Sequence, residues 1–185
     1  KFTGYLQPGN FEVFRENCRA SGLLKLNAQF AFCSGRNQLR MYKEDIEANL
    51  RTPGLYGFEL LDLHDYLGQG TALVGVLDAF WQEKGYVKPD EFRCFCDETV
   101  LLAAFDGYVY TNQQIIEVPV SVCHFGKENL EQVVISWRLS QDDEIVQSGE
   151  ITCQQIVCGQ NTELGKVMLD FGKLSGNQNV IFMLE

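Results

Sequence analysis

The hydrophobic period of this chain changes near residue 99, and this change constrains the fold more than any other feature. Before it, apolar residues such as Leu39, Ile46 and Leu50 recur at helical spacing. After it, residues 116–122 and 133–139 alternate between apolar and polar side chains. A spacing of three to four predicts amphipathic helices, and strict alternation predicts half-buried strands. We therefore expect mixed α and β structure in two parts, residues 1–99 and 100–185.

The first part is predicted to be mostly helical. One helix is expected from Asn10 to the Ser21-Gly22 pair, and a longer one from near Leu23 to the Thr-Pro-Gly sequence at 52–54. In the first helix, Phe11, Phe14 and Cys18 share a face that should pack inward. In the second, the inward face should consist of Leu39, Tyr42, Ile46 and Leu50. The charged residues of the second helix should face solvent, and they are Lys43, Glu44, Glu47 and Arg51.

A buried strand is predicted next, because residues 56–63 are short, largely apolar and flanked by glycine. A helix over about 72–83 follows, and Pro89 begins a short helix that reaches about Cys96. Helix, strand and helix in this order are typical of a parallel α/β sheet. With one strand visible, this part is expected to be incomplete on its own.

The second part is predicted to be an antiparallel sandwich. Residues 141–144 form a polar turn between two apolar runs, which indicates a hairpin. Short strands at intervals of roughly 10–15 residues, separated by turns, are typical of such a sandwich. The strands are expected at 116–122, 133–139, 145–153, 167–171 and 180–184.

Composition excludes several classes of function. The net charge of −10 and the absence of a basic stripe argue against a nucleic-acid partner. No apolar run reaches the ~20 residues of a membrane span. The seven cysteines are odd in number and widely spread, and Cys94-x-Cys96 is too closely spaced for the usual zinc pair. We expect no metal and no cofactor.

One stretch resembles a known junction. The residues are Gly57-Phe58-Glu59-Leu60-Leu61-Asp62-Leu63-His64-Asp65-Tyr66, followed by Leu67-Gly68-Gln69-Gly70-Thr71. They resemble the eighth strand and following loop of the catalytic barrel in family 2 glycoside hydrolases, the β-galactosidase and β-glucuronidase group, and most closely the sugar-binding-domain relatives in gut Bacteroidetes. Leu61 and Leu63 flank Asp62 where many members carry tryptophans. The resemblance implies the C-terminal part of a (β/α)₈ TIM barrel over residues 1–99, followed by an immunoglobulin-like antiparallel β-sandwich.

The resemblance also implies which side chains lie near a sugar. Active sites of such barrels lie at the C-terminal ends of the strands. The expected substrate-binding residues are Asp62, His64, Asp65, Tyr66 and Gln69. Four of them have a structural alternative: a salt bridge for Asp62, a buried satisfied ring for His64, a cap for Asp65 and a turn for Gln69. No catalytic residue is expected here, because the family's two carboxylates would both precede Lys1.

Two functions follow as expectations. The first is a fragment of a retaining β-glycoside hydrolase, inactive alone, whose partner is a β-linked glycan and whose location is periplasmic or at the cell surface. The second is a non-catalytic carbohydrate-binding or scaffold sandwich, with Phe105, Tyr108 and Tyr110 as candidate contacts. A lone strand at 57–63 would leave unpaired edges, so we also expect a possible homo-oligomer. Trp81, Trp137 and His124 are expected to have structural roles.

Overall fold

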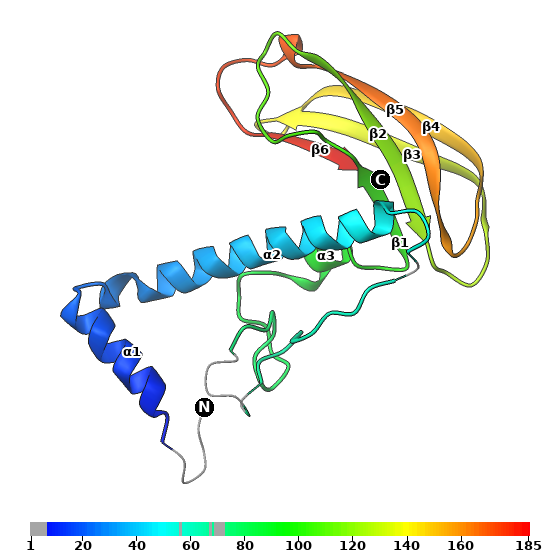
Figure 1. The fold of residues 1–185 in the computed structure, drawn as a ribbon. Coiled ribbons are helices and arrows are strands. Elements are labelled where there is room, and N and C mark those ends of the chain that lie inside the picture. Colours follow the sequence, from blue (N-terminus) through cyan, green and yellow to red (C-terminus); the bar gives the residue numbers. More distant parts are fainter. Residues whose placement is uncertain (1–6, 56, 67, 69–72) are drawn as a thin grey trace. The chain divides into compact units, whose positions relative to one another are not determined.

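The computed structural model describes residues 7–55, 57–66, 68 and 73–185, and their elements are labelled in Figure 1. These residues divide into two compact units. Unit 1 consists of Lys1–Asp45 and Phe58–Arg93, and unit 2 of Ile46–Gly57 and Cys94–Glu185. Unit 2 thus includes a helical segment that the boundary predicted at residue 99 assigns to the first part.

Three of the four predicted helices are present. They are α1 (Gly9–Ala20), α2 (Asn27–Arg51) and α3 (Pro89–Arg93), and a short 3₁₀ helix, η1 (Leu24–Leu26), precedes α2. Ser21 and Gly22 end α1, and Gly22 adopts the left-handed φ of 70° that favours glycine there. In the described part of the chain, no helix is long and apolar enough to cross a membrane.

The burial of these helices differs from expectation at two places. Leu39, Ile46 and Leu50 are buried as predicted. Glu47, predicted to face solvent, is only 7% exposed, and its carboxylate pairs with Arg51 at 3.1 Å. No residue of α1 is buried, and Phe14, predicted to pack inward, is 52% exposed. The apolar face of α1 is therefore only partly covered, with Phe11 and Cys18 half-buried and Phe14 exposed.

Two predicted elements of unit 1 are wrong. Residues 57–63 form no strand, and the described residues pair there only through an isolated bridge between His64 and Leu77. A parallel strand needs a neighbouring strand to satisfy its backbone, and the described residues of this segment have none alongside. Residues 73–83 form turns instead of a helix. The Asp78 carboxylate accepts bonds from the backbone N–H groups of Phe80 and Gln82, which competes with helical hydrogen bonding.

Unit 2 contains two antiparallel sheets of three strands. One sheet has the order β1-β2-β5 and the other β4-β3-β6. The strands are β1 (Thr99–Ala103), β2 (Ile115–His124), β3 (Leu130–Gln141), β4 (Glu144–Ile156), β5 (Gln160–Asp170) and β6 (Val180–Leu184). The five predicted strands are confirmed, and β1 is additional because its short apolar run shows no alternation.

Both sheets contribute to one apolar core. Val118 and Leu169 come from one sheet and Leu139 from the other, and each is at most 1% exposed. The indole of Trp137 packs against this core as expected. The predicted hairpin is confirmed: β3 and β4 join through Asp142 and Asp143, whose φ values of 50° and 65° fit the two-residue turn that matches strand twist. The chain is thus a mixed α and β protein with two small antiparallel sheets.

Candidate functional site

Four of the expected sugar-binding residues, Asp62, His64, Asp65 and Tyr66, lie on an irregular segment of unit 1 that a largely buried ion pair holds in place. Asp65 is 7% exposed, and its Oδ1 accepts from Lys84 Nζ at 2.6 Å and from the backbone N–H of Gly75 at 3.0 Å. Lys84 Nζ also donates to the Gly75 carbonyl at 2.6 Å. Removing either charge would leave its partner poorly compensated, so the pair ties residue 65 firmly to residues 75–84.

His64 lies directly before this ion pair and forms an aromatic pair with Trp81. The two ring centroids are 4.5 Å apart with an interplanar angle of 38°. His64 Nδ1 donates to the Asp65 carbonyl at 2.8 Å, because a carbonyl oxygen can only accept. The neutral ring then has Nε2 as a hydrogen-bond acceptor. Trp81 is 61% exposed, so the pair offers an accessible aromatic surface with a polar edge.

The other expected residues have different positions. Asp62 is half-buried with a left-handed φ of 62°, and Tyr66 is 52% exposed. Gln69 lies outside the described residues. The structure therefore brings His64 and Asp65 together, with Asp65 committed to Lys84.

Trp81 and Lys84 are the members of this cluster that the sequence did not reveal as such. The sequence predicts a structural role for Trp81 in a helix over about 72–83, but residues 73–83 form turns instead. Lys84 belongs to no local sequence motif, because it is separated from its partner Asp65 by 19 positions in the sequence. A single aspartate next to a histidine in an apolar segment was the only signal available for the ion pair.

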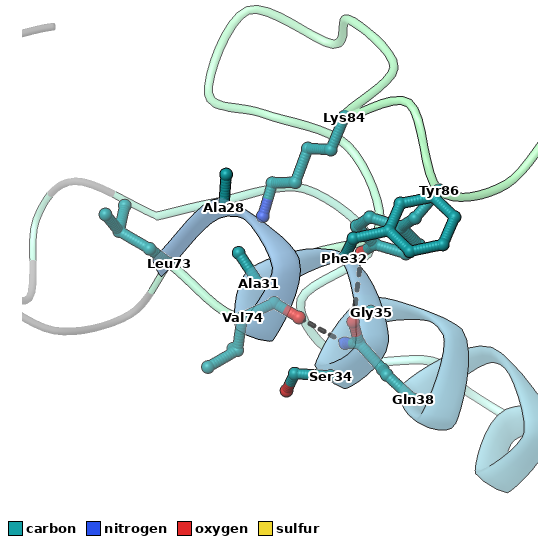
Figure 2. Close-up of a pocket in the computed structure, with 10 residues that line it drawn as sticks. All are labelled: Ala28, Ala31, Phe32, Ser34, Gly35, Gln38, Leu73, Val74, Lys84 and Tyr86. Carbon is teal, nitrogen blue, oxygen red and sulfur yellow. Dashed lines mark hydrogen bonds between the residues drawn. The ribbon is translucent and has the colours of Figure 1, made fainter. Parts of the chain in front are cut away.

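A second layer of polar contacts joins this segment to α2. The Tyr86 hydroxyl lies 3.0 Å from Gln38 Oε1 and 3.2 Å from the Gly75 carbonyl, and Figure 2 shows Gln38 also bonded to the Val74 carbonyl. Burial, and then the nearby Asp65 carboxylate and Tyr42, raise the pKa of Tyr86 above its ordinary value. This network keeps Tyr86 a neutral donor.

A hollow of about 600 Å³ opens between α2 and residues 73–86 within unit 1. Small side chains of α2, together with Gln38, Lys84 and Tyr86, line it (Figure 2). The polar groups of Gln38, Lys84 and Tyr86 at its wall are already engaged with protein partners. Its lining is therefore a packed, hydrogen-bonded support beside the His64–Trp81 pair.

The second histidine is structural. His124 is 3% exposed, its Nε2 donates to the Glu128 carbonyl at 2.8 Å, and Thr99 Oγ1 lies 2.7 Å from Nδ1. Both ring nitrogens are thus satisfied. None of the seven cysteines forms a disulfide. Among the described residues, no group of three or more His, Cys, Asp or Glu side chains is placed to hold a metal ion.

Comparison with known proteins gives one family match. Residues 114–185, which lie in unit 2, match the model of a family described as a domain of unknown function (DUF8488). No curated protein matches the chain. The match covers less than half of the sequence and is a similarity of the sheet region alone.

Proposed function

We propose that this chain is part of a retaining β-glycoside hydrolase and supplies residues of its sugar subsite. The observation that carries the proposal is the accessible His64–Trp81 pair beside the buried Asp65–Lys84 ion pair. An exposed aromatic face suits the apolar face of a pyranose, and the histidine edge suits a hydroxyl. Ligand sites are typically built from such apolar surfaces with a few fixed polar groups.

The proposal assigns no catalytic carboxylate to this chain. Retaining glycosidases need two carboxyl groups about 5–5.5 Å apart, one as nucleophile and one as acid/base. Asp65 is held by Lys84 and Gly75, so it serves as a support. Under this proposal the two catalytic carboxylates belong to other strands of the barrel, and the chain alone does not hydrolyse glycosides.

The fold that the proposal implies is the C-terminal part of a (β/α)₈ barrel followed by an immunoglobulin-like sandwich. In that reading residues 57–63 become the eighth strand when neighbouring strands are present. Apolar side chains are exposed on α1 and on the first turns of α2, and they support this fold. In a (β/α)₈ barrel, the apolar face of each helix packs against the parallel sheet and against the neighbouring helices. Phe14, Phe30 and Phe32 are each about half exposed.

The test compares this chain with a longer polypeptide that contains it, on a panel of β-linked nitrophenyl glycosides. We expect hydrolysis by the longer polypeptide and none by this chain. In the active form, Trp81→Ala and Asp62→Asn should each lower kcat/KM about tenfold, the equivalent of one lost substrate contact of about 1.4 kcal/mol.

The matched control is Glu59→Gln, because Glu59 is an exposed carboxylate of the same segment. It should leave kcat/KM unchanged. The proposal fails if the longer polypeptide hydrolyses no glycoside of the panel, or if this chain alone is active.

A further inference from the structure

Unit 2 contains a hollow of its own, at the end of the sheets where three connections meet. It has a volume of about 990 Å³. Its walls come from residues 108–112 between β1 and β2, from Gln141 and Asp142 at the β3–β4 turn, and from Phe171, Leu174 and residues 176–180 after β5. Nothing in the glycosidase proposal uses this hollow, and the inference below does not depend on that proposal.

Side-chain amides dominate the polar lining. Buried Gln141 is the frame: its Oε1 accepts from the Ser175 N–H at 3.0 Å, and its Nε2 donates to Gln178 Oε1 at 2.6 Å. These bonds fix the loop that carries Asn177 and Asn179. Within the described part of the chain, the side-chain amides of Asn112, Asn177 and Asn179 have no protein hydrogen bond and are exposed. Each amide can both donate and accept, as sugar hydroxyls require.

The aromatic lining consists of two rings that stack on each other and a third ring that is exposed. Tyr110 stacks on Phe171 with centroids 5.1 Å apart, and its hydroxyl donates to Asp106 at 2.7 Å. Tyr108 is 82% exposed. Tyrosine adds a large, rigid contact area at little cost in conformational entropy, which suits a binding surface.

The charges of the lining define the ligand class. Asp142 is the one carboxylate among the lining residues, and these residues include no lysine, arginine or histidine. The chain as a whole carries a net charge of −10. An anionic ligand such as a phosphate or a uronic acid would be repelled and would find no cation to pair with. A neutral ligand rich in hydroxyl groups fits the amides and the tyrosine face.

We propose that this hollow is a binding site for a neutral oligosaccharide, contacted by the Tyr108 ring and by the amides of Asn112, Asn177 and Asn179. The site is non-catalytic, because the lining has no pair of carboxylates. It gives unit 2 a recognition role in addition to its structural one.

The test is a titration of the full 185-residue chain, followed by backbone amide NMR shifts, with lactose, cellobiose, xylobiose and mannobiose, and with glucuronic acid as the anionic comparison. At least one neutral disaccharide should shift amides of residues 108–112 and 176–179 saturably, with a Kd of about 1 mM or below. Glucuronic acid should not. Tyr108→Ala should raise the Kd about tenfold, the scale of one aromatic contact. Asn177→Ala should raise it about threefold, as expected for one neutral hydrogen bond.

The matched control is Phe125→Ala, which removes an exposed aromatic ring of unit 2 that does not line the hollow, and it should leave the Kd unchanged. Absence of any shift at about 10 mM sugar, or tighter binding of glucuronic acid than of neutral sugars, would overturn the inference. Shifts confined to residues 62–66 and 81 would also overturn it and would favour the glycosidase subsite. Failure of the nitrophenyl glycoside test would leave this result untouched.

Discussion

At the scale of single residues, the environment of Tyr86 predicts how the stability of the fold depends on pH. Its folded pKa is raised above 10.0 by burial and by Asp65 and Tyr42. The native state therefore holds this proton more tightly than the unfolded chain does. Its contribution to stability is complete below pH 10 and is lost as pH rises through the folded pKa. Tyr86→Phe should lower the free energy of unfolding by about 1 kcal/mol at neutral pH, because the hydrogen bonds of the hydroxyl are lost. Above about pH 10, the thermal unfolding midpoint of Tyr86→Phe should fall less steeply with pH than that of the wild-type protein.

The measurement is the thermal unfolding midpoint of both proteins at several pH values on either side of that point. Tyr66→Phe is the matched control, because Tyr66 is an exposed tyrosine of the same unit. An equal flattening in Tyr66→Phe would show that any tyrosine has this effect and would contradict the role of the Tyr86 network.

At the scale of elements, close packing of Tyr86 on α2 depends on Gly35. A Cβ added at Gly35 would lie 2.5 Å from two ring atoms of Tyr86, far inside van der Waals contact. The ring cannot move freely, because its hydroxyl is held near Gln38 and Gly75. Gly35→Ala should destabilise unit 1 by about 2 kcal/mol through overpacking, although alanine normally favours a helix.

Gly9→Ala gives the comparison. Gly9 begins α1 and has no heavy atom within 4 Å of an added Cβ, so alanine there should be neutral or slightly stabilising. Amide hydrogen exchange of α2 would report both changes in the element concerned. If the amides of α2 are protected from exchange equally well in Gly35→Ala and in the wild-type protein, the contact between Gly35 and Tyr86 is not tight.

The same elements show what the sequence could predict. Helices α1 and α2 and five strands followed from periodicity, because their hydrogen bonds are local or join neighbouring strands with clear alternation. Residues 57–63 carry a strand pattern without a partner strand, and residues 73–83 carry a helix pattern that Asp78 diverts into turns. Of the expected sugar-binding residues, the sequence placed His64 and Asp65 on one segment. It could not place Trp81 and Lys84 beside them, since their contacts are tertiary and follow no motif.

At the scale of the whole molecule, self-association is expected from exposed apolar side chains and not from unpaired strand edges. Residues 57–63 form no strand, so they offer no strand edges. Instead, large apolar side chains are 40–56% exposed along α1, η1 and the start of α2. They are Val13, Phe14, Leu23, Leu24, Leu26, Phe30 and Phe32. Exposed apolar side chains that form one contiguous patch are typical of an interaction site.

We therefore expect the isolated chain to associate as its concentration rises, because association removes this surface from water. Sedimentation velocity should show a sedimentation coefficient that increases with concentration, and Val13→Ser combined with Phe14→Ser should reduce the increase. Ile145→Ser, which removes an apolar side chain 59% exposed on unit 2, should not. A wild-type chain that stays monomeric over the whole range would contradict the prediction. If instead all three proteins associate alike, the contact between copies of the chain lies elsewhere and does not involve Val13 and Phe14 of α1.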